Sequence, residues 1–494
     1  MDYLDLKKQF RHRVILLTGY VLLAIAIVTG TLVLLYQAYG FGIGKNGTVI
    51  QNGLTFFSSQ PHPAQIYINN KLEPAATNTS LVLPAGIYNV KLSRSGYLDW
   101  QRSIELQGGD VQHFDYPFLF PDKLTSNKLQ TYTSAPGLMT QSPDRRWLLV
   151  EEPASSTTIT FDVYDLKNPT KAPTDISLPS NVVTKATTGE NWQLEEWADD
   201  NQHIVLQHDY DGKTEFILVD RANPAQSLNL NITLASNPTK LTLNNKKYDH
   251  YYLYDAATGV LQTASLQNPV LSPVLQHVLA YQSYGTNSLL YATDSGTPAG
   301  KVLIKLAIGS HTYPIRTFPA GTNYLLDLTN YSGTLYVAVG ASSENKIYIY
   351  TDPVGQLAAL PNHALVPSQV LHVNAPNYLS FSTSAQFVVA EDGTQFGVYD
   401  IENTKGYNYT TTQSLAAPQS HATWMDGDRL MYVSSGKLSV FDYDDTNQHI
   451  LMDASSNYLP AFAPDYKDVY VLTPNGSTGQ FDLVQTSLLT PADR

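Results

Sequence analysis

The chain has 494 residues, more than one ordinary hydrophobic core holds, so two or more folded units are expected. Its formal charge of −13 argues against nucleic-acid binding, because neutralising phosphates requires a basic face. It contains no cysteine, which excludes disulfides, thiolate nucleophiles, iron–sulfur clusters and cysteine zinc sites. Only 15% of the residues are charged while tyrosine occurs 33 times, a composition that favours strands and turns over helices.

An uncharged apolar segment, residues 14–36, lies close to the N-terminus. As a helix its roughly 23 residues would span the ~30 Å hydrocarbon layer of a membrane. Basic residues in front of such a segment predict that residues 1–13 stay in the cytoplasm and that the bulk of the chain is extracytoplasmic. These residues are Lys7, Lys8, Arg11 and Arg13.

The alternative for this segment is a cleaved signal peptide. Its apolar region would normally be ~7–15 residues long and end in a small-x-small site. Here the stretch is longer, and Tyr36 stands where a small residue is wanted. We therefore favour an uncleaved, single-pass anchor followed by a linker over residues 37–49. The exterior has a charge of about −15 and no disulfide, which suits a bacterial envelope and leaves neutral or cation-bridged partners open.

Residues 50–120 alternate between apolar and polar side chains and contain turn residues. Tyr88, Val90 and Leu92 fall on one face of a predicted strand, and Ile66 and Ile68 on one face of another. Such strands bury one face and leave the other in water. In the turn before residue 87, a glycine is expected to supply a positive φ.

Several short motifs in this region resemble those of the PEGA domain family. They are Ala64–Lys71, Leu83–Val90, Ser95–Tyr97 and Leu106–Gly109. The resemblance implies a small β-sandwich of the kind found mainly in bacterial surface proteins. Five residues of these motifs are expected to fold the domain rather than to carry chemistry: Pro84, Gly86, Tyr88, Gly96 and Tyr97.

From residue 125 to residue 494 a repeated pattern predicts a β-propeller. Each unit has a short strand, a polar turn, an apolar strand, and a third strand that ends near an aspartate. The turns that mark the units contain Ser142, Pro143, Asp144, Asp199, Asp426, Pro464 and Asp465, and weaker copies lie near Asn245, Thr286, Tyr331 and Ser384. The mean spacing of about 46 residues is the length of a four-stranded blade. Eight blades are expected, or seven if two weak units merge.

The turns resemble those of TolB-like and WD40-like propellers, which implies the architecture alone. A propeller must also close its ring. Residues 129–133 have strand character and precede the first unit, so we expect them to pair beyond Phe481–Thr486 as the outer strand of the last blade. The predicted fold class is therefore all-β: a transmembrane helix, a small β-sandwich and a β-propeller.

Several motifs of known enzymes are absent from the sequence: there is no Gly-x-Ser-x-Gly, no His-Glu-x-x-His, no Walker loop, and no Gly-x-Gly-x-x-Gly that follows a predicted strand. His203 and His208 are five residues apart, and in a strand this places them on opposite faces, which disfavours a shared metal. Residues 209–212 lack the full ligand set of a calcium loop and are interpreted as a hairpin turn. The acidic group at residues 442–445 is interpreted as a polar turn, and the tyrosines between residues 248 and 254 as packing residues.

No catalytic residue, cofactor site or metal ligand is therefore predicted. The leading hypothesis is a membrane-anchored binding or scaffolding protein that presents a propeller to a surface protein or glycan. One alternative is an enzyme that acts on envelope polymers through a site dispersed over several blades. Contacting carboxylates or histidines in the channel would favour it. The other alternative is a structural envelope component, for which a long apolar strip on the propeller wall would be expected.

Overall fold

The computed structural model describes the whole chain except residues 1–5, 39, 44–48, 154–157, 361–362, 412–414, 416–420 and 477–478. The chain forms two compact units, Met1–Lys123 together with Leu489–Arg494, and Leu124–Leu488. The sequence placed the last six residues in the propeller. In the structure they pack with the first unit instead, because their polar side chains have partners there.

The N-terminal apolar segment is a helix, α1 (Leu6–Ala38), which is longer at both ends than the predicted span. The basic residues before position 14 are good helix formers, so the helix includes them rather than beginning after them. Within Lys7–Tyr36 the helix is long and apolar enough to cross a membrane: its 18-residue apolar window has a mean hydropathy of 2.3, and none of that window is buried by the protein. The predicted linker is also partly ordered, because residues Phe41–Ile43 form strand β1.

The first unit continues as a sandwich of two four-stranded sheets, counted over its described residues. One sheet has the order β1-β2-β5, with β8 parallel to β2, and the other has the order β4-β3-β6-β7. The strands are β2 (Val49–Phe57), β3 (Gln65–Ile68), β4 (Lys71–Ala76), β5 (Thr79–Pro84), β6 (Gly86–Ser93), β7 (Trp100–Leu106) and β8 (Val111–Phe114).

The core of the sandwich is built from the faces that the alternation predicted. Ile66 and Ile68 are buried, as are Val90 and Leu92, and Tyr88 packs against the same cluster at its edge. Trp100 is the largest side chain of this core and is 1% exposed. The one-sided burial of these strands follows from their period of two.

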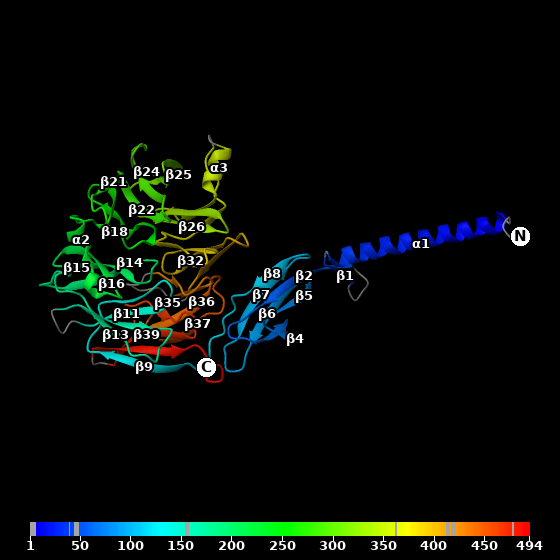
Figure 1. Ribbon diagram of the computed structural model, residues 1–494, viewed down its shortest axis with the longest axis horizontal. Helices are drawn as coiled ribbons and strands as arrows, with labels where there is room; N and C mark the ends of the chain where they lie inside the picture. Colours follow the sequence, from blue (N-terminus) through cyan, green and yellow to red (C-terminus); the bar gives the residue numbers. More distant parts are fainter. Residues whose placement is uncertain are drawn as a thin grey trace. The chain divides into compact units, whose positions relative to one another are not determined.

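The second unit is a β-propeller, and its described residues form eight four-stranded sheets, here called blades (Figure 1). Within each of the first seven blades the strands are antiparallel neighbours in chain order. The first three blades are β10 (Met139–Gln141), β11 (Trp147–Glu151), β12 (Thr160–Asp165), β13 (Thr174–Ser177); β14 (Glu190–Trp197), β15 (His203–Tyr210), β16 (Lys213–Asp220), β17 (Leu228–Asn229); and β18 (Lys240–Leu243), β19 (His250–Asp255), β20 (Val260–Ser265), β21 (Ser272–Leu275).

The fourth to seventh blades are β22 (Val278–Tyr284), β23 (Ser288–Thr293), β24 (Lys301–Ile308), β25 (His311–Pro319); β26 (Tyr324–Tyr331), β27 (Thr334–Ala341), β28 (Lys346–Thr351), β29 (Gln369–His372); β30 (Tyr378–Phe381), β31 (Phe387–Glu391), β32 (Gln395–Asp400), β33 (Lys405–Thr410); and β34 (Thr423–Trp424), β35 (Arg429–Ser434), β36 (Lys437–Asp442), β37 (His449–Asp453). Two short helices, α2 (Leu230–Thr233) and α3 (Pro353–Ala359), follow blade strands.

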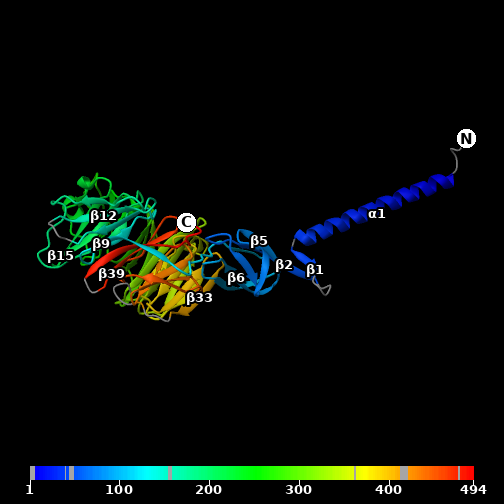
Figure 2. The same cartoon turned by 90° about the horizontal axis from the view of Figure 1, so that it is seen from below.

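The eighth blade closes the ring with a strand from the start of the unit. It contains β38 (Ala461–Phe462), β39 (Asp468–Asn475), β40 (Gln480–Ser487) and, beyond β40, strand β9 (Thr125–Tyr132). Figure 2 shows β9, in cyan, beside the red end of the chain. The predicted closing strand is confirmed, and it begins four residues earlier than expected. Its pairing removes the open edge that β40 would otherwise present.

The propeller core lies between successive blades, so both faces of a blade are covered. The middle strands are therefore continuously buried, as in β16, where Glu215–Asp220 are all buried. One cluster joins the first and second blades, and another joins the eighth blade to the first through Tyr132, Val150 and Tyr164. A blade with two apolar faces is stable only when it is stacked between neighbours.

Candidate functional site

The propeller has two faces, which are defined by the turns that form them. In a blade, the first strand starts at the same end as the turn between the second and third strands, as the pairs Glu190–Tyr210 and Tyr324–Ala341 show. This end of the blades forms the upper face. The lower face carries the turns between the first and second strands. All of the blade-turn residues singled out in the sequence lie in these lower turns.

The first lower turn shows what the Ser-Pro-Asp sequence does. The amide of Arg145 donates to the carbonyl of Ser142 at 2.8 Å, and Arg145 takes a positive φ of 60°. The Ser142 hydroxyl accepts from the amide of Trp147, and the Asp144 carboxylate accepts from the amide of Arg146. Pro143 is exposed at the tip. These residues shape a tight turn.

The lower turns also bond from blade to blade. The amide of Asp144 donates to the side chain of Asn201, and the amide of Asp199 donates to the carbonyl of Lys246. Ser384 donates to the carbonyl of Gly427. These three hydrogen bonds fix neighbouring blades to one another on this face.

The remaining lower-turn residues have local partners. The Asp426 carboxylate accepts a hydrogen bond from the guanidinium of the buried Arg429, and this guanidinium also lies 3.8 Å from Asp442. Asp465 accepts from the amide of Lys467 and pairs with its ammonium group at 3.0 Å, and Pro464 precedes it in the turn. The structure therefore distributes these residues around the ring and does not bring them together in one site.

Sequence reasoning missed Arg145, which follows the Ser-Pro-Asp motif. Its guanidinium donates to the carbonyl of Met425 and lies 4.3 Å from the ring centroid of Tyr466. It thus joins the first blade to the seventh and eighth. Burial lowers the pKa of Arg145, and the nearby Asp426 opposes that shift. No local signal could identify this role, because the partners are about 280 and 320 residues away in the chain.

The sandwich motif residues lie in or beside strands β5 and β6, and one expectation about them is corrected. The Tyr88 hydroxyl donates to the carbonyl of Pro84 at 2.6 Å. The expected positive φ at Gly86 is wrong, because Gly86 is the extended first residue of β6. A Cβ there would make only ordinary contacts with the Tyr88 ring at 3.7 Å. Positive φ is found instead at Gly96, with a value of 82°, next to the buried Tyr97.

The basic residues Lys7, Lys8, Arg11 and Arg13 lie in the first two turns of α1, and all four are exposed.

Two hollows open on the upper face of the propeller. The larger, of about 870 Å³, lies between the fourth and fifth blades and is lined by Leu279, Ala280, Gly321, Thr322, Asn323, Tyr324, Ser342 and Ser343. These described lining residues carry hydroxyl, amide and apolar groups, and none of them carries a carboxylate, an amino or a guanidinium group. Such a lining suits a neutral ligand that offers hydroxyl or amide groups.

The smaller hollow, of about 370 Å³, lies on the second blade and is lined by Gly189, Glu190, Asn191, Asp209, Tyr210, Asp211, Gly212, Lys213 and Thr214. The hairpin interpretation of residues 209–212 is confirmed, because β15 and β16 pair up to Tyr210 and Lys213. The Asp211 carboxylate accepts from the amides and hydroxyls of Thr187 and Thr188. These bonds lower its pKa to about 2, so Asp211 fixes the neighbouring loop.

His208 lies beneath this hollow and is fully buried. Its Nδ1 is 3.0 Å from Glu215 and its Nε2 is 3.2 Å from Glu190, and its ring stacks on Trp192. His203 is elsewhere, near Asp220 and stacked on Tyr248. The two histidines do not share a partner, because an odd spacing in a strand sends their side chains to opposite faces.

The other motifs weighed in the sequence are packing or turn residues. Tyr251, Tyr252 and Tyr254 are buried in the cores beside the third blade, and Tyr248 is 38% exposed. In the acidic group at residues 442–445, Asp442 accepts from Asn447 and Asp444 accepts from Thr446. Both outcomes agree with the interpretations drawn from composition and turn type.

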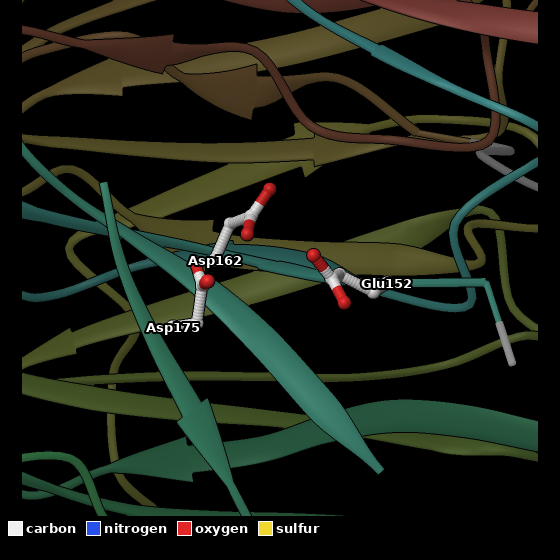
Figure 3. A group of neighbouring side chains, drawn as sticks. All are labelled: Glu152, Asp162 and Asp175. Carbon is white, nitrogen blue, oxygen red and sulfur yellow. The ribbon is translucent and has the colours of Figure 1, made fainter. Parts of the chain in front are cut away.

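A group of three carboxylates was not singled out in the sequence. Oxygens of Glu152, Asp162 and Asp175 all lie within 4.8 Å of one another (Figure 3). Burial raises the pKa of Asp162 to about 6, while the hydroxyl of Tyr132, 2.7 Å away, opposes the shift. Three carboxylates are suitable ligands for a divalent cation, although calcium takes six to eight oxygens. The group forms because Asp162 and Asp175 are paired across β12 and β13.

Comparison with known proteins agrees with this architecture. Residues 54–119 match the family described as the PEGA domain, so the resemblance found in the sequence is confirmed for this region. No curated protein matches the chain.

Similar solved structures are β-propellers and other proteins of low identity. The β-propeller domain of Cps50 (Swd1) from Myceliophteria thermophila is 10% identical, with 74% of this chain and 99% of that chain covered and a TM-score of 0.40. Hsv2p from Kluyveromyces lactis is 11% identical, covering 64% and 98%, with a TM-score of 0.40. An uncharacterized protein from Listeria monocytogenes EGD-e is 13% identical, covering 67% and 93%, with a TM-score of 0.40.

Proposed function

We propose that this chain is a membrane-anchored cell-surface protein that binds a protein or a glycan through the upper face of its propeller. The observation that carries the proposal is the difference between the two faces. The lower turns are bonded to one another across blades, whereas both hollows described above open on the upper face. A face with concave, partly polar surfaces presents groups to a ligand, and a face of interlocked turns holds the ring together.

The ligand class follows from charge. The exterior is strongly acidic, and the larger hollow is lined by neutral polar groups around Asn323, Tyr324 and Ser343. A tyrosine ring among hydroxyl and amide groups offers contact area and hydrogen bonds to sugars or to peptide backbones. A neutral glycan or an uncharged peptide segment therefore fits this surface better than a polyanion does.

The proposed activity is binding rather than catalysis. His208 contacts two carboxylates, but it is 0% exposed, both of its ring nitrogens face those carboxylates, and its ring is stacked on Trp192. A catalytic histidine has to reach a substrate.

Lateral association is supported less well than binding. The most exposed apolar side chains of the described blades belong to four different blades; they are Ile232, Val270, Val366 and Ile450.

The membrane topology can be tested by cysteine labelling, because the chain has no cysteine of its own. We expect a membrane-impermeant maleimide to label Ser343→Cys on intact cells, and to label Gln9→Cys only after lysis. The reason is that the basic flank of α1 keeps residue 9 in the cytoplasm. Labelling of Gln9→Cys on intact cells would contradict this topology, and loss of residue 9 from the mature chain would indicate a cleaved signal peptide.

The binding face can be tested by crosslinking in cells. A photo-crosslinking amino acid at Ser343, exposed beside the larger hollow, is expected to yield a reproducible adduct with a surface protein or glycan. The matched control carries the same amino acid at Thr383, which is exposed in a lower turn. Equal adducts from both positions, or adducts from Thr383 alone, would refute an upper-face site.

A further inference from the structure

The Gly96-Tyr97 pair of the sandwich contacts the C-terminal residues of the chain. The Tyr97 hydroxyl donates to the Asp493 carboxylate at 2.7 Å and accepts from the amide of Thr490 at 3.0 Å. Arg94 forms an ion pair with the same carboxylate. These bonds join residues almost 400 positions apart, and all of them lie within the first unit.

The C-terminal segment is shaped for this contact. The Thr490 hydroxyl donates to Asp493 at 2.9 Å, and the amide of Asp493 donates to the carbonyl of Thr490 at 3.0 Å, so residues 490–493 form a turn. A Cβ at Gly96 would lie 3.1 Å from the Thr490 methyl group. Glycine at position 96 therefore supplies both its positive φ and the room for Thr490.

The ionic part of the contact is half-buried. The side chains of Arg94 and Asp493 are 21% and 18% exposed, and Tyr97 is 6% exposed. Hydrogen bonds from Arg94 and Tyr97 lower the pKa of Asp493, so its carboxylate is ionised at neutral pH. Charge-assisted bonds of this kind are stronger than neutral ones.

The same corner of the sandwich also holds the segment that leads into the propeller. The amide of Leu98 donates to the carbonyl of Phe120 at 2.8 Å, and the amide of Asp122 donates to the carbonyl of Gly96 at 3.0 Å. The propeller begins with β9 and ends with β40, and Thr125 is paired with Ser487 in their register. The entry and exit strands of the ring therefore continue directly into two segments that are both bonded to residues 94–98.

We propose that residues 94–98 form an intramolecular docking site for the turn at Thr490–Asp493, and that this docking keeps the end of β40 paired with β9. The site recognises an ionised carboxylate through Arg94 and Tyr97, and a threonine in close contact with Gly96. The chain passes from one unit to the other at residues 123–124 and again at residues 488–489. A ring whose last strand is held at its end frays less readily than one whose last strand is free.

Trimming of the full-length protein in detergent by a carboxypeptidase tests the docking. We expect Asp493→Asn and Tyr97→Phe each to raise the rate at which residues before Arg494 are removed by about tenfold, because each removes bonds to a charged group. Both variants keep the shape of the side chain. The control is Asp453→Asn, which breaks an exposed pair with Lys437 on the seventh blade. Equal trimming rates for the wild type and the two docking variants would overturn the docking site.

Hydrogen exchange of the same variants tests the consequence for the ring. We expect the amides at the end of β40 and at the start of β9 to exchange about tenfold faster in Asp493→Asn, while the middle strands of the fourth blade are unchanged. Unchanged exchange in β9 and β40, together with faster trimming, would overturn the role in ring closure. A general rise in exchange over all blades would also overturn it.

Discussion

Replacing Tyr132 with alanine is expected to lower the free energy of unfolding of the propeller by about 4 kcal/mol, because it empties a buried aromatic position and removes one of the two tyrosine hydroxyls that donate to Asp162. Tyr132 is the last residue of the closing strand β9 and is 4% exposed. It packs with Val150 and Tyr164 between the eighth blade and the first. The measurement is urea unfolding of the detergent-solubilised protein, followed by tryptophan fluorescence.

Two further variants separate the parts of this effect. Tyr132→Phe keeps the ring and removes only the hydroxyl that donates to Asp162, so a loss of about 1 to 2 kcal/mol is expected. Asn127→Ala, at an exposed position of the same strand, should be close to the wild type. If Tyr132→Ala and Asn127→Ala were equally stable, β9 would not contribute to the core in the way described.

The propeller is expected to become more stable as the pH falls from 8 to 5.5, and Glu391 makes the largest single contribution. Burial raises the pKa of Glu391 from 4.5 to about 9, while the amide of Ala422, 2.7 Å from one carboxyl oxygen, opposes the shift. The other oxygen has no hydrogen-bond partner among the residues that the structure describes. A carboxyl group whose pKa is raised in the folded state binds its proton more tightly there, so stability is greatest below the unfolded pKa and falls as the pH rises toward 9.

Other buried carboxyl groups act in the same direction. Burial raises the pKa values of Glu151, Glu195 and Asp428 to about 7, and those of Asp162 and Asp327 to about 6. The opposite group includes Asp165 and Asp211, whose pKa values hydrogen bonds lower to about 2. The contribution of these two aspartates is lost only below about pH 4, outside the window from 5.5 to 8. Burial also lowers the pKa values of His421 and His449, and these two groups offset part of the gain in stability at the acid end of the window.

Glu391→Gln isolates the contribution of this carboxyl group. The amide keeps an oxygen for the Ala422 N–H and does not titrate, so the difference in stability between pH 5.5 and pH 8 should shrink by about 3 kcal/mol. Thermal and urea unfolding at both pH values measure this difference. Glu402→Gln, at an exposed position of the next turn, is the control and should leave the difference unchanged. A wild-type protein whose stability rises from pH 5.5 to pH 8 would contradict the assignment.

Strand faces and the closing strand were predictable from the sequence, whereas the partners of individual side chains were not. The alternation around Val90 and Leu92 fixed their burial, and the position of residues 129–133 before the first repeat predicted their pairing with β40. The turn at Asp211-Gly212 was also predictable, because the two strands that it joins are adjacent in the chain. By contrast, Gly86 was assigned a positive φ because it ends the predicted turn Pro84-Ala85-Gly86, and the extended start of β6 overrode that local preference.

The sequence by itself determined the order of the parts: an apolar helix, a PEGA sandwich and a ring of repeated sheets. It did so because period, turn residues and repeat length act over a few residues to a few tens of residues. Only the tertiary structure decided which side chains are hydrogen-bond partners. Tyr132 donates to Asp162, Arg145 donates to the carbonyl of Met425, and Tyr97 donates to Asp493. Contacts between blades, and between the chain's end and its sandwich, have no fixed spacing in the sequence, because they depend on how separate elements pack.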